Sequence, residues 1–205
     1  MKRIIALFLV ICAVFLTSCG VAKFEYTDGM LVNTKNGNKY NALPAGFEPC
    51  GVGDVYGEYG AFSLYRVQTP SGEELPPETW LTEEYAGNAT VVYLASSEPV
   101  PSFRNMSFDK CYICIEDENV MSIAEIDEKA AINSIISALD SESTALWPRV
   151  DLINTYSLKF HSNDLPAVFY SLVYCECISG NYLYDRASNT CVEVGDMLSE
   201  WIEGE

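Results

Sequence analysis

The sequence predicts an α+β fold: one or two helices pack on a face of an antiparallel sheet, preceded by a β/loop-rich N-terminal half. Two observations lead to this prediction. After residue 106 the hydrophobic patterns follow the order β-β-α-β-β-β-β-α with tight connections, which favours an antiparallel sheet with helices on one face. Between residues 20 and 105, most of the glycines and prolines separate short apolar runs, a pattern typical of strands joined by turns.

The C-terminal part, residues 106–205, contains the clearer elements. A helix is expected from Asp127 to Leu139, because Ile132, Ile135 and Leu139 fall on one apolar stripe. A second, short helix is expected after residue 196. The expected strands cover 111–116, 120–124, 156–160, 167–178, 182–184 and 191–194.

The N-terminal part, residues 20–105, contains shorter strands, expected at 24–26, 30–32, 61–67 and 90–94. Turns separate them, and Asn36-Gly37 is a strong hairpin signal. The pattern leaves two arrangements open: this part either wraps around the C-terminal part or forms a small sheet of its own.

The first twenty residues have the parts of a signal peptide. Lys2 and Arg3 supply positive charge, and the apolar run from Ile4 to Leu16 spans 13 residues. A helix needs about 20 residues to cross a bilayer, so the run predicts a signal peptide and not a permanent anchor. The run ends in Leu16-Thr17-Ser18-Cys19, which resembles the lipobox of bacterial lipoproteins.

This resemblance covers the first twenty residues only. It implies that the signal peptide, residues 1–18, is cleaved between Ser18 and Cys19 and that a diacylglyceryl group is attached to Cys19. Residues 19–205 then form an extracytoplasmic domain that is held at the cell membrane by lipid. Ser18 is a mild departure, since Gly or Ala is more usual there. Two or three acyl chains bind a membrane stably, at about 0.8 kcal/mol per buried methylene group.

The chain is strongly acidic, with a formal net charge of −17. Residues 1–18 contain two basic residues and no acidic ones, so the remaining 187 residues carry ten basic and 29 acidic residues, a net charge of −19. Such a surface repels nucleic-acid phosphates and anionic lipid headgroups. We therefore expect no nucleic-acid partner and a membrane contact made through the lipid.

Cysteines are the most prominent candidate functional residues after Cys19. Cys12 leaves with the signal peptide, and six cysteines remain as candidates for disulfides or metal ligands: Cys50, Cys111, Cys114, Cys175, Cys177 and Cys191. Outside the cytoplasm an even number of cysteines is compatible with disulfides. The sequence leaves fifteen pairings open.

Two cysteine pairs allow a thiol or metal function. Cys111 and Cys114 have the C-x-x-C spacing of redox and zinc sites, but they lie in an expected strand and not at a helix N-terminus. Residues at i and i+3 of a strand lie about 10 Å apart on opposite faces, too far for a disulfide. Together with Cys175 and Cys177 they could supply four thiolates to zinc. Packed thiols are the simpler expectation, so no cofactor is predicted.

A hydrolase of cell-wall polymers is a further alternative, and His161 is its main candidate residue. This single histidine precedes Ser162 and Asp164, but members of a catalytic triad come together from different elements rather than from adjacent residues. The acidic clusters place no two carboxylates at a suitable distance for glycoside hydrolysis. Catalytic residues are therefore not expected.

Aromatic side chains in the N-terminal part are the remaining hint of recognition. Such residues either line a carbohydrate or peptide site or pack a small β core; they are Tyr56, Tyr59, Tyr65, Trp80 and Tyr85. The leading hypothesis from the sequence is a non-enzymatic lipoprotein that binds or scaffolds something at the cell envelope. The thiol or metal protein and the wall hydrolase remain the alternatives.

Overall fold

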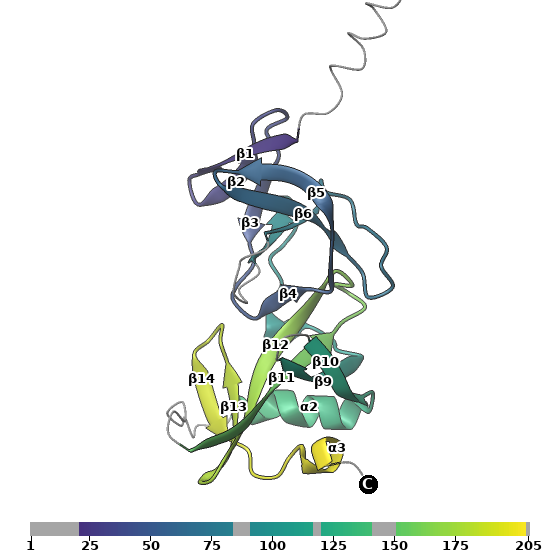
Figure 1. Cartoon of the computed structure of the whole chain (residues 1–205), viewed down its shortest axis with the longest axis vertical. Helices are drawn as coiled ribbons and strands as arrows, with labels where there is room; N and C mark the ends of the chain where they lie inside the picture. Colours follow the sequence, from purple (N-terminus) through teal and green to yellow (C-terminus); the bar gives the residue numbers. More distant parts are fainter. Residues whose placement is uncertain (1–20, 84–90, 117–119, 141–150, 204–205) are drawn as a thin grey trace, which may run out of the picture.

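The computed structural model describes residues 21–83, 91–116, 120–140 and 151–203 (Figure 1). The described part of the chain is mostly β, with 53% of its residues in strands and 11% in helices. The predicted α+β class is therefore wrong. The chain forms a closed seven-stranded barrel and a second sheet, because strands distant in sequence pair in a way that local patterns do not reveal.

The barrel is built from the N-terminal part of the chain, in the strand order β1-β2-β3-β8-β7-β6-β5. Its strands are β1 (Ala22–Thr27), β2 (Met30–Asn33), β3 (Lys39–Ala42), β5 (Gly51–Tyr59), β6 (Phe62–Gln68), β7 (Trp80–Glu83) and β8 (Val91–Ala95). Neighbouring strands are antiparallel except at the closure, where β1 and β5 run parallel. Closure leaves the barrel without open edges.

The closure depends on a glycine at the β1–β5 pair. Gly57 pairs with Ala22, and the Phe24 ring lies over Gly57. A Cβ atom on Gly57 would lie 2.5 Å from the Phe24 ring and 2.9 Å from the Ala22 carbonyl oxygen. Both distances are shorter than atoms tolerate, so only glycine allows β5 to approach β1 this closely.

The second sheet has the strand order β10-β9-β11-β12-β13-β14, and β4 also pairs with β12. Its strands are β4 (Phe47–Pro49), β9 (Lys110–Glu116), β10 (Val120–Ile126), β11 (Leu152–His161), β12 (Val168–Cys177), β13 (Gly180–Asp185) and β14 (Thr190–Glu193). β4 lies between two barrel strands in sequence. The chain thus leaves the barrel after β3, adds β4 to the second sheet, and returns to the barrel as β5 (Figure 1).

One hydrophobic core joins the barrel to the second sheet. Along β8 the side chains alternate: Val92 and Leu94 belong to the shared core, whereas Tyr93 and Ala95 point into the barrel interior. Tyr170 of β12 lies in the shared core, where its ring stacks on Phe103 with a centroid distance of 3.9 Å. The shared core fixes the two sheets against each other.

Three short helices complete the described part of the chain. They are the 3₁₀ helix η1 (Phe103–Asn105), α2 (Lys129–Ala138) and α3 (Ser199–Glu203). Ile132 and Ile135 of α2 are buried in the shared core, on the face of the second sheet that carries Leu158 and Phe160. This side is the inner face of the second sheet, and the opposite side is its outer face.

Candidate functional site: a cleft between the barrel and the second sheet

The strand β11 supplies functional groups to the outer face. Leu158 and Phe160 are fully buried in the shared core, so the residues that alternate with them, Lys159 and His161, point to the outer face. The β9–β11 ladder places Tyr112 directly across from Lys159. Charged and aromatic groups therefore gather where the outer face approaches the barrel.

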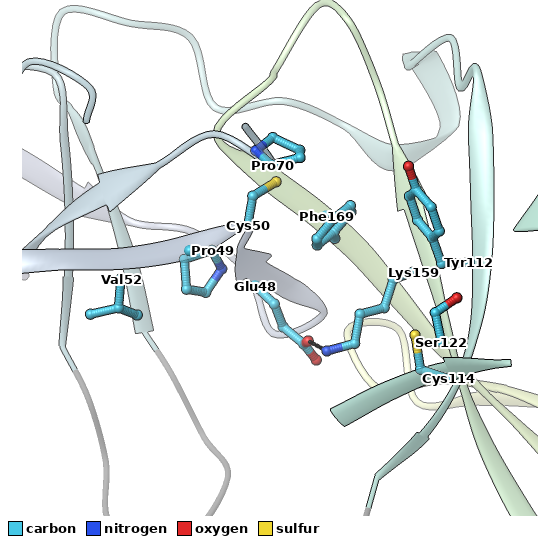
Figure 2. Close-up of a pocket in the computed structure, with 11 residues that line it drawn as sticks. Glu48, Pro49, Cys50, Val52, Pro70, Tyr112, Cys114, Ser122, Lys159 and Phe169 are labelled. Carbon is cyan, nitrogen blue, oxygen red and sulfur yellow. Dashed lines mark hydrogen bonds and ion pairs between the residues drawn. The ribbon is translucent and has the colours of Figure 1, made fainter. Parts of the chain in front are cut away.

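A cleft of about 480 Å³ opens at this place (Figure 2). One wall comes from β4, the start of β5 and the loop after β6, and the other wall comes from β9 to β12. Most of the lining is apolar or aromatic: Pro49, Cys50, Val52 and Pro70 lie on the first wall, and Phe169 and Tyr112 lie on the second. The volume is within the range of small-molecule sites, about 300–1,000 Å³.

An ion pair lies in the cleft. Lys159 Nζ donates a hydrogen bond to Glu48 Oε2 at 2.9 Å, as the dashed line in Figure 2 marks. The pair reaches across β12, because β4 and β11 lie on either side of that strand. The Lys159 and Glu48 side chains are only 14% and 22% exposed, so little water screens their attraction. Removing one of these two charges would leave the other charge in a place with little access to water.

Two aromatic rings line the cleft beside the ion pair. Tyr112 and Phe169 pack edge to face, with ring centroids 5.8 Å apart and an interplanar angle of 76°. Burial raises the pKa of the Tyr112 hydroxyl, so this group stays protonated near neutral pH. The rings provide an apolar surface within reach of a paired positive and negative charge.

Cys50 is half-buried and lines the cleft. Burial raises the pKa of the Cys50 thiol to about 12, although the positive charge of Lys159 acts in the opposite direction. A thiol reacts as its thiolate, and at neutral pH almost none is present on this side chain. Cys50 therefore adds a small apolar surface to the cleft and not a nucleophile.

The structure divides the candidate cysteines between the two faces of the second sheet. Cys111 lies in the shared core on the inner face, while Cys114 lines the cleft on the outer face. Cys175 and Cys177 pack on the outer face of β12 with Val173, and Cys191 is buried on β14. All six candidate cysteines are described, and no disulfide joins them. Burial raises the pKa of Cys111, and it raises that of Cys175 to about 12.

Among the described residues, no group of three or more His, Cys, Asp and Glu side chains could hold a metal ion. The four thiolates of the zinc hypothesis are divided between the two faces of the sheet, because Cys111 points inward. The geometry of the described residues gives the zinc hypothesis no support.

His161 pairs with a residue that its sequence neighbours did not suggest. Its Nδ1 lies 2.9 Å from Asp109 Oδ1, and both side chains are partly buried. Ser162 Oγ donates instead to the Ser107 carbonyl oxygen at 2.8 Å and accepts a hydrogen bond from the Asp164 backbone N–H. The serine hydroxyl thus has other partners, and the triad hypothesis has no geometric support here.

The aromatic residues of the N-terminal part do not form a common groove in the described chain. Trp80 belongs to the shared core, and Tyr56 and Tyr59 pack against the barrel interior. Tyr85 lies outside the described residues. The rings that line the cleft are Tyr112 and Phe169, one from each of two sheet strands of the C-terminal part.

The signal peptide and the lipobox also lie outside the described residues, which begin at residue 21. Within the described chain, no helix has the length and apolar character needed to cross a membrane. The lipid anchor on Cys19 therefore stays a prediction from the sequence.

No protein-family model, curated protein or solved structure matches the chain. Sequence reasoning missed the Glu48–Lys159 pair and the Tyr112–Phe169 wall. The period-2 pattern of β11 could have placed Lys159 on a face opposite to Leu158, but its partner on β4 lies 111 residues away in sequence.

Proposed function

We propose that this chain is a lipid-anchored extracytoplasmic protein that binds a small ligand in the cleft between its barrel and its second sheet. The observation that carries the binding function is the cleft itself: an apolar hollow of about 480 Å³ with a shielded ion pair in it. Apolar pockets with a few convergent polar groups are the usual form of small-molecule sites.

The walls of the cleft support binding because they are held in place. Phe169 and Lys159 lie on neighbouring strands whose other faces are buried in the shared core. Cys50, at the start of the opposite wall, is fixed by a backbone hydrogen bond from its N–H to the Ala167 carbonyl oxygen at 2.9 Å. A preformed cleft binds a ligand without first ordering its own walls, which lowers the entropic cost of binding.

The lipobox resemblance supports the location. Lipid on Cys19 would hold the protein to a membrane whose anionic headgroups repel a chain of net charge −19. β1 begins at Ala22, so the barrel would follow the anchor after a very short linker. Replacing Cys19→Ser should abolish labelling with radioactive palmitate; a Cys19→Ser variant that still incorporates palmitate would contradict the anchor.

The cleft is tested with a bulky side chain at its entrance. Val52 lines the cleft and is 40% exposed, so Val52→Trp should fill the hollow without disturbing the core. Val55→Trp is the matched control, since Val55 is 50% exposed on the same strand but does not line the cleft. The probe is the neutral fluorophore N-phenyl-1-naphthylamine, added to residues 19–205 carrying Cys19→Ser, which include every described residue.

The fluorophore should bind the parent protein at one site. Val52→Trp should raise its dissociation constant by at least about tenfold, and Val55→Trp should leave it within about twofold of the parent. Equal binding by the two variants, or no binding by the parent, would contradict the proposed function.

A further inference from the structure

The ion pair limits which ligands the cleft can accept. Lys159 and Glu48 place an ammonium group and a carboxylate 2.9 Å apart on the lining of the cleft. Any ligand that fills the cleft removes water from this pair. A purely apolar ligand can still bind against the apolar walls, but it returns no hydrogen bond to the pair, which lowers its affinity relative to a ligand that does.

A ligand with a single charge is repelled by the residue of the pair that carries the same charge. An anion that approaches Lys159 also approaches the Glu48 carboxylate, on a chain whose residues 19–205 carry a net charge of −19. A cation that approaches Glu48 is repelled by the Lys159 ammonium group. A zwitterion avoids both penalties, because its carboxylate can accept from Lys159 Nζ while its ammonium group donates to the Glu48 carboxylate.

The rest of the cleft accepts an apolar group of moderate size. Tyr112 and Phe169 present rings on one wall, and Pro49, Val52 and Pro70 face them from the other. Aromatic rings pair favourably edge to face or offset-stacked, and aliphatic groups lose water against the same surfaces.

Resting on the proposed function of the cleft, we infer that its ligand is a small zwitterion with an apolar side chain, of the class of the aromatic and large aliphatic α-amino acids. The backbone charges of the amino acid bind Lys159 and Glu48. Its side chain lies against Tyr112 and Phe169.

The test compares four compounds that share a phenyl ring and differ in charge: L-phenylalanine, 3-phenylpropionate, phenethylamine and 3-phenylpropanol. Each is titrated by calorimetry into residues 19–205 carrying Cys19→Ser. L-phenylalanine should bind about tenfold or more tightly than each of the other three, because only it completes two charge-assisted hydrogen bonds.

Substitutions in the ion pair test whether its two charges cause the tighter binding of L-phenylalanine. Lys159→Met should weaken L-phenylalanine and 3-phenylpropionate but not phenethylamine, and Glu48→Gln should weaken L-phenylalanine and phenethylamine but not 3-phenylpropionate. The control Lys23→Met removes a charge from the exposed Lys23–Glu58 pair on the barrel and should leave all four affinities unchanged. The double variant Glu48→Gln/Lys159→Met removes both charges of the pair together, so it keeps the test available if a single variant does not fold.

Several results would overturn the inference. They are equal affinity for the four compounds, tighter binding of a singly charged compound than of L-phenylalanine, no measurable binding of L-phenylalanine, or undiminished L-phenylalanine binding by the double variant. Each is distinguishable from failure of the proposed function, because the neutral fluorophore would still bind the parent and be excluded by Val52→Trp.

Discussion

Tyr170 offers a sharp test of how the second sheet is held together beneath the cleft. Its hydroxyl donates a hydrogen bond to Asp185 Oδ1 at 2.7 Å, and the two residues are 2% and 5% exposed. Burial and the Asp185 carboxylate raise the pKa of Tyr170, so the hydroxyl remains a donor throughout the neutral range. Tyr170→Phe removes this donor and keeps the ring that stacks on Phe103.

The expected loss of unfolding free energy depends on the hydrogen bonds that Asp185 keeps in the Tyr170→Phe variant. A hydrogen bond to a charged group contributes about 1.5–3 kcal/mol to stability. The Asp185 carboxylate still accepts from the Ala187 N–H at 2.9 Å and from Ser188 Oγ at 2.6 Å, so it is not left without partners. We therefore expect Tyr170→Phe to lower the free energy of unfolding by about 2 kcal/mol.

The assay is urea unfolding followed by tryptophan fluorescence at pH 7. The control is Tyr26→Phe, which removes a hydroxyl from a ring that is 47% exposed on β1 and should change stability by less than about 0.5 kcal/mol. A Tyr170→Phe loss no larger than that of the control would refute the argument, because the buried hydrogen bond would then contribute nothing measurable.

Three further predictions test the backbone, a buried carboxyl group and the cleft thiol. Gly46→Ala should lower the free energy of unfolding by about 2 kcal/mol in the same urea assay. Gly46 has φ +100°, and a Cβ atom added there would lie 3.3 Å from the Tyr170 ring. An unchanged urea midpoint would contradict this prediction. Burial raises the folded-state pKa of Glu83, although a hydrogen bond with Tyr93 acts the other way, so ionisation of Glu83 costs stability as the pH rises above its unfolded pKa of about 4.3. Glu83→Gln should accordingly gain stability relative to the parent between pH 4 and pH 7, and a difference that does not change with pH would argue against it. At pH 7.5, iodoacetamide should alkylate Cys50 at least about a hundredfold more slowly in the folded protein than in guanidinium, because burial raises the pKa of the Cys50 thiol to about 12. Peptide mass spectrometry follows the reaction, and equal rates in the two conditions would show that the thiol is not buried.

The elements of the C-terminal part could be predicted from the sequence because their patterns are local. The helix expected at 127–139 is α2 (Lys129–Ala138), and the strand expected at 167–178 is β12 (Val168–Cys177). Both carry enough apolar residues in a regular period to identify the element. The fold class was wrong nevertheless, because the class depends on how the strands pair.

The barrel could not be predicted for two physical reasons. Three of its strands, β3, β5 and β7, carry weak sequence signals, and in β5 three glycines resemble a series of turns. These glycines allow close approach instead, as Gly57 shows against the Phe24 ring. Closure also needs the parallel β1–β5 pair and the β3–β8 pair, which join segments that are far apart in sequence.

The cleft could not be predicted from the sequence for a related reason. Its charged pair joins Glu48 of a three-residue strand to Lys159 of β11, and neither residue belongs to a recognisable motif. Cys111 and Cys114 have the spacing of a redox or zinc site, but they lie on opposite faces of the sheet: Cys111 points into the core and Cys114 lines the cleft. Residue spacing indicated local chemistry, while the candidate site arises from contacts between distant strands.

The central claim, that the cleft is the ligand site, is tested most directly by locating a bound probe. Nuclear Overhauser effects are measured between N-phenyl-1-naphthylamine and the ¹³C-labelled methyl groups of residues 19–205 carrying Cys19→Ser. We expect contacts with the Val52 methyl groups, which line the cleft, and none with Val55. Contacts with the exposed Ile153 or Ile178, at 60% and 82% exposure, in place of Val52 would contradict it.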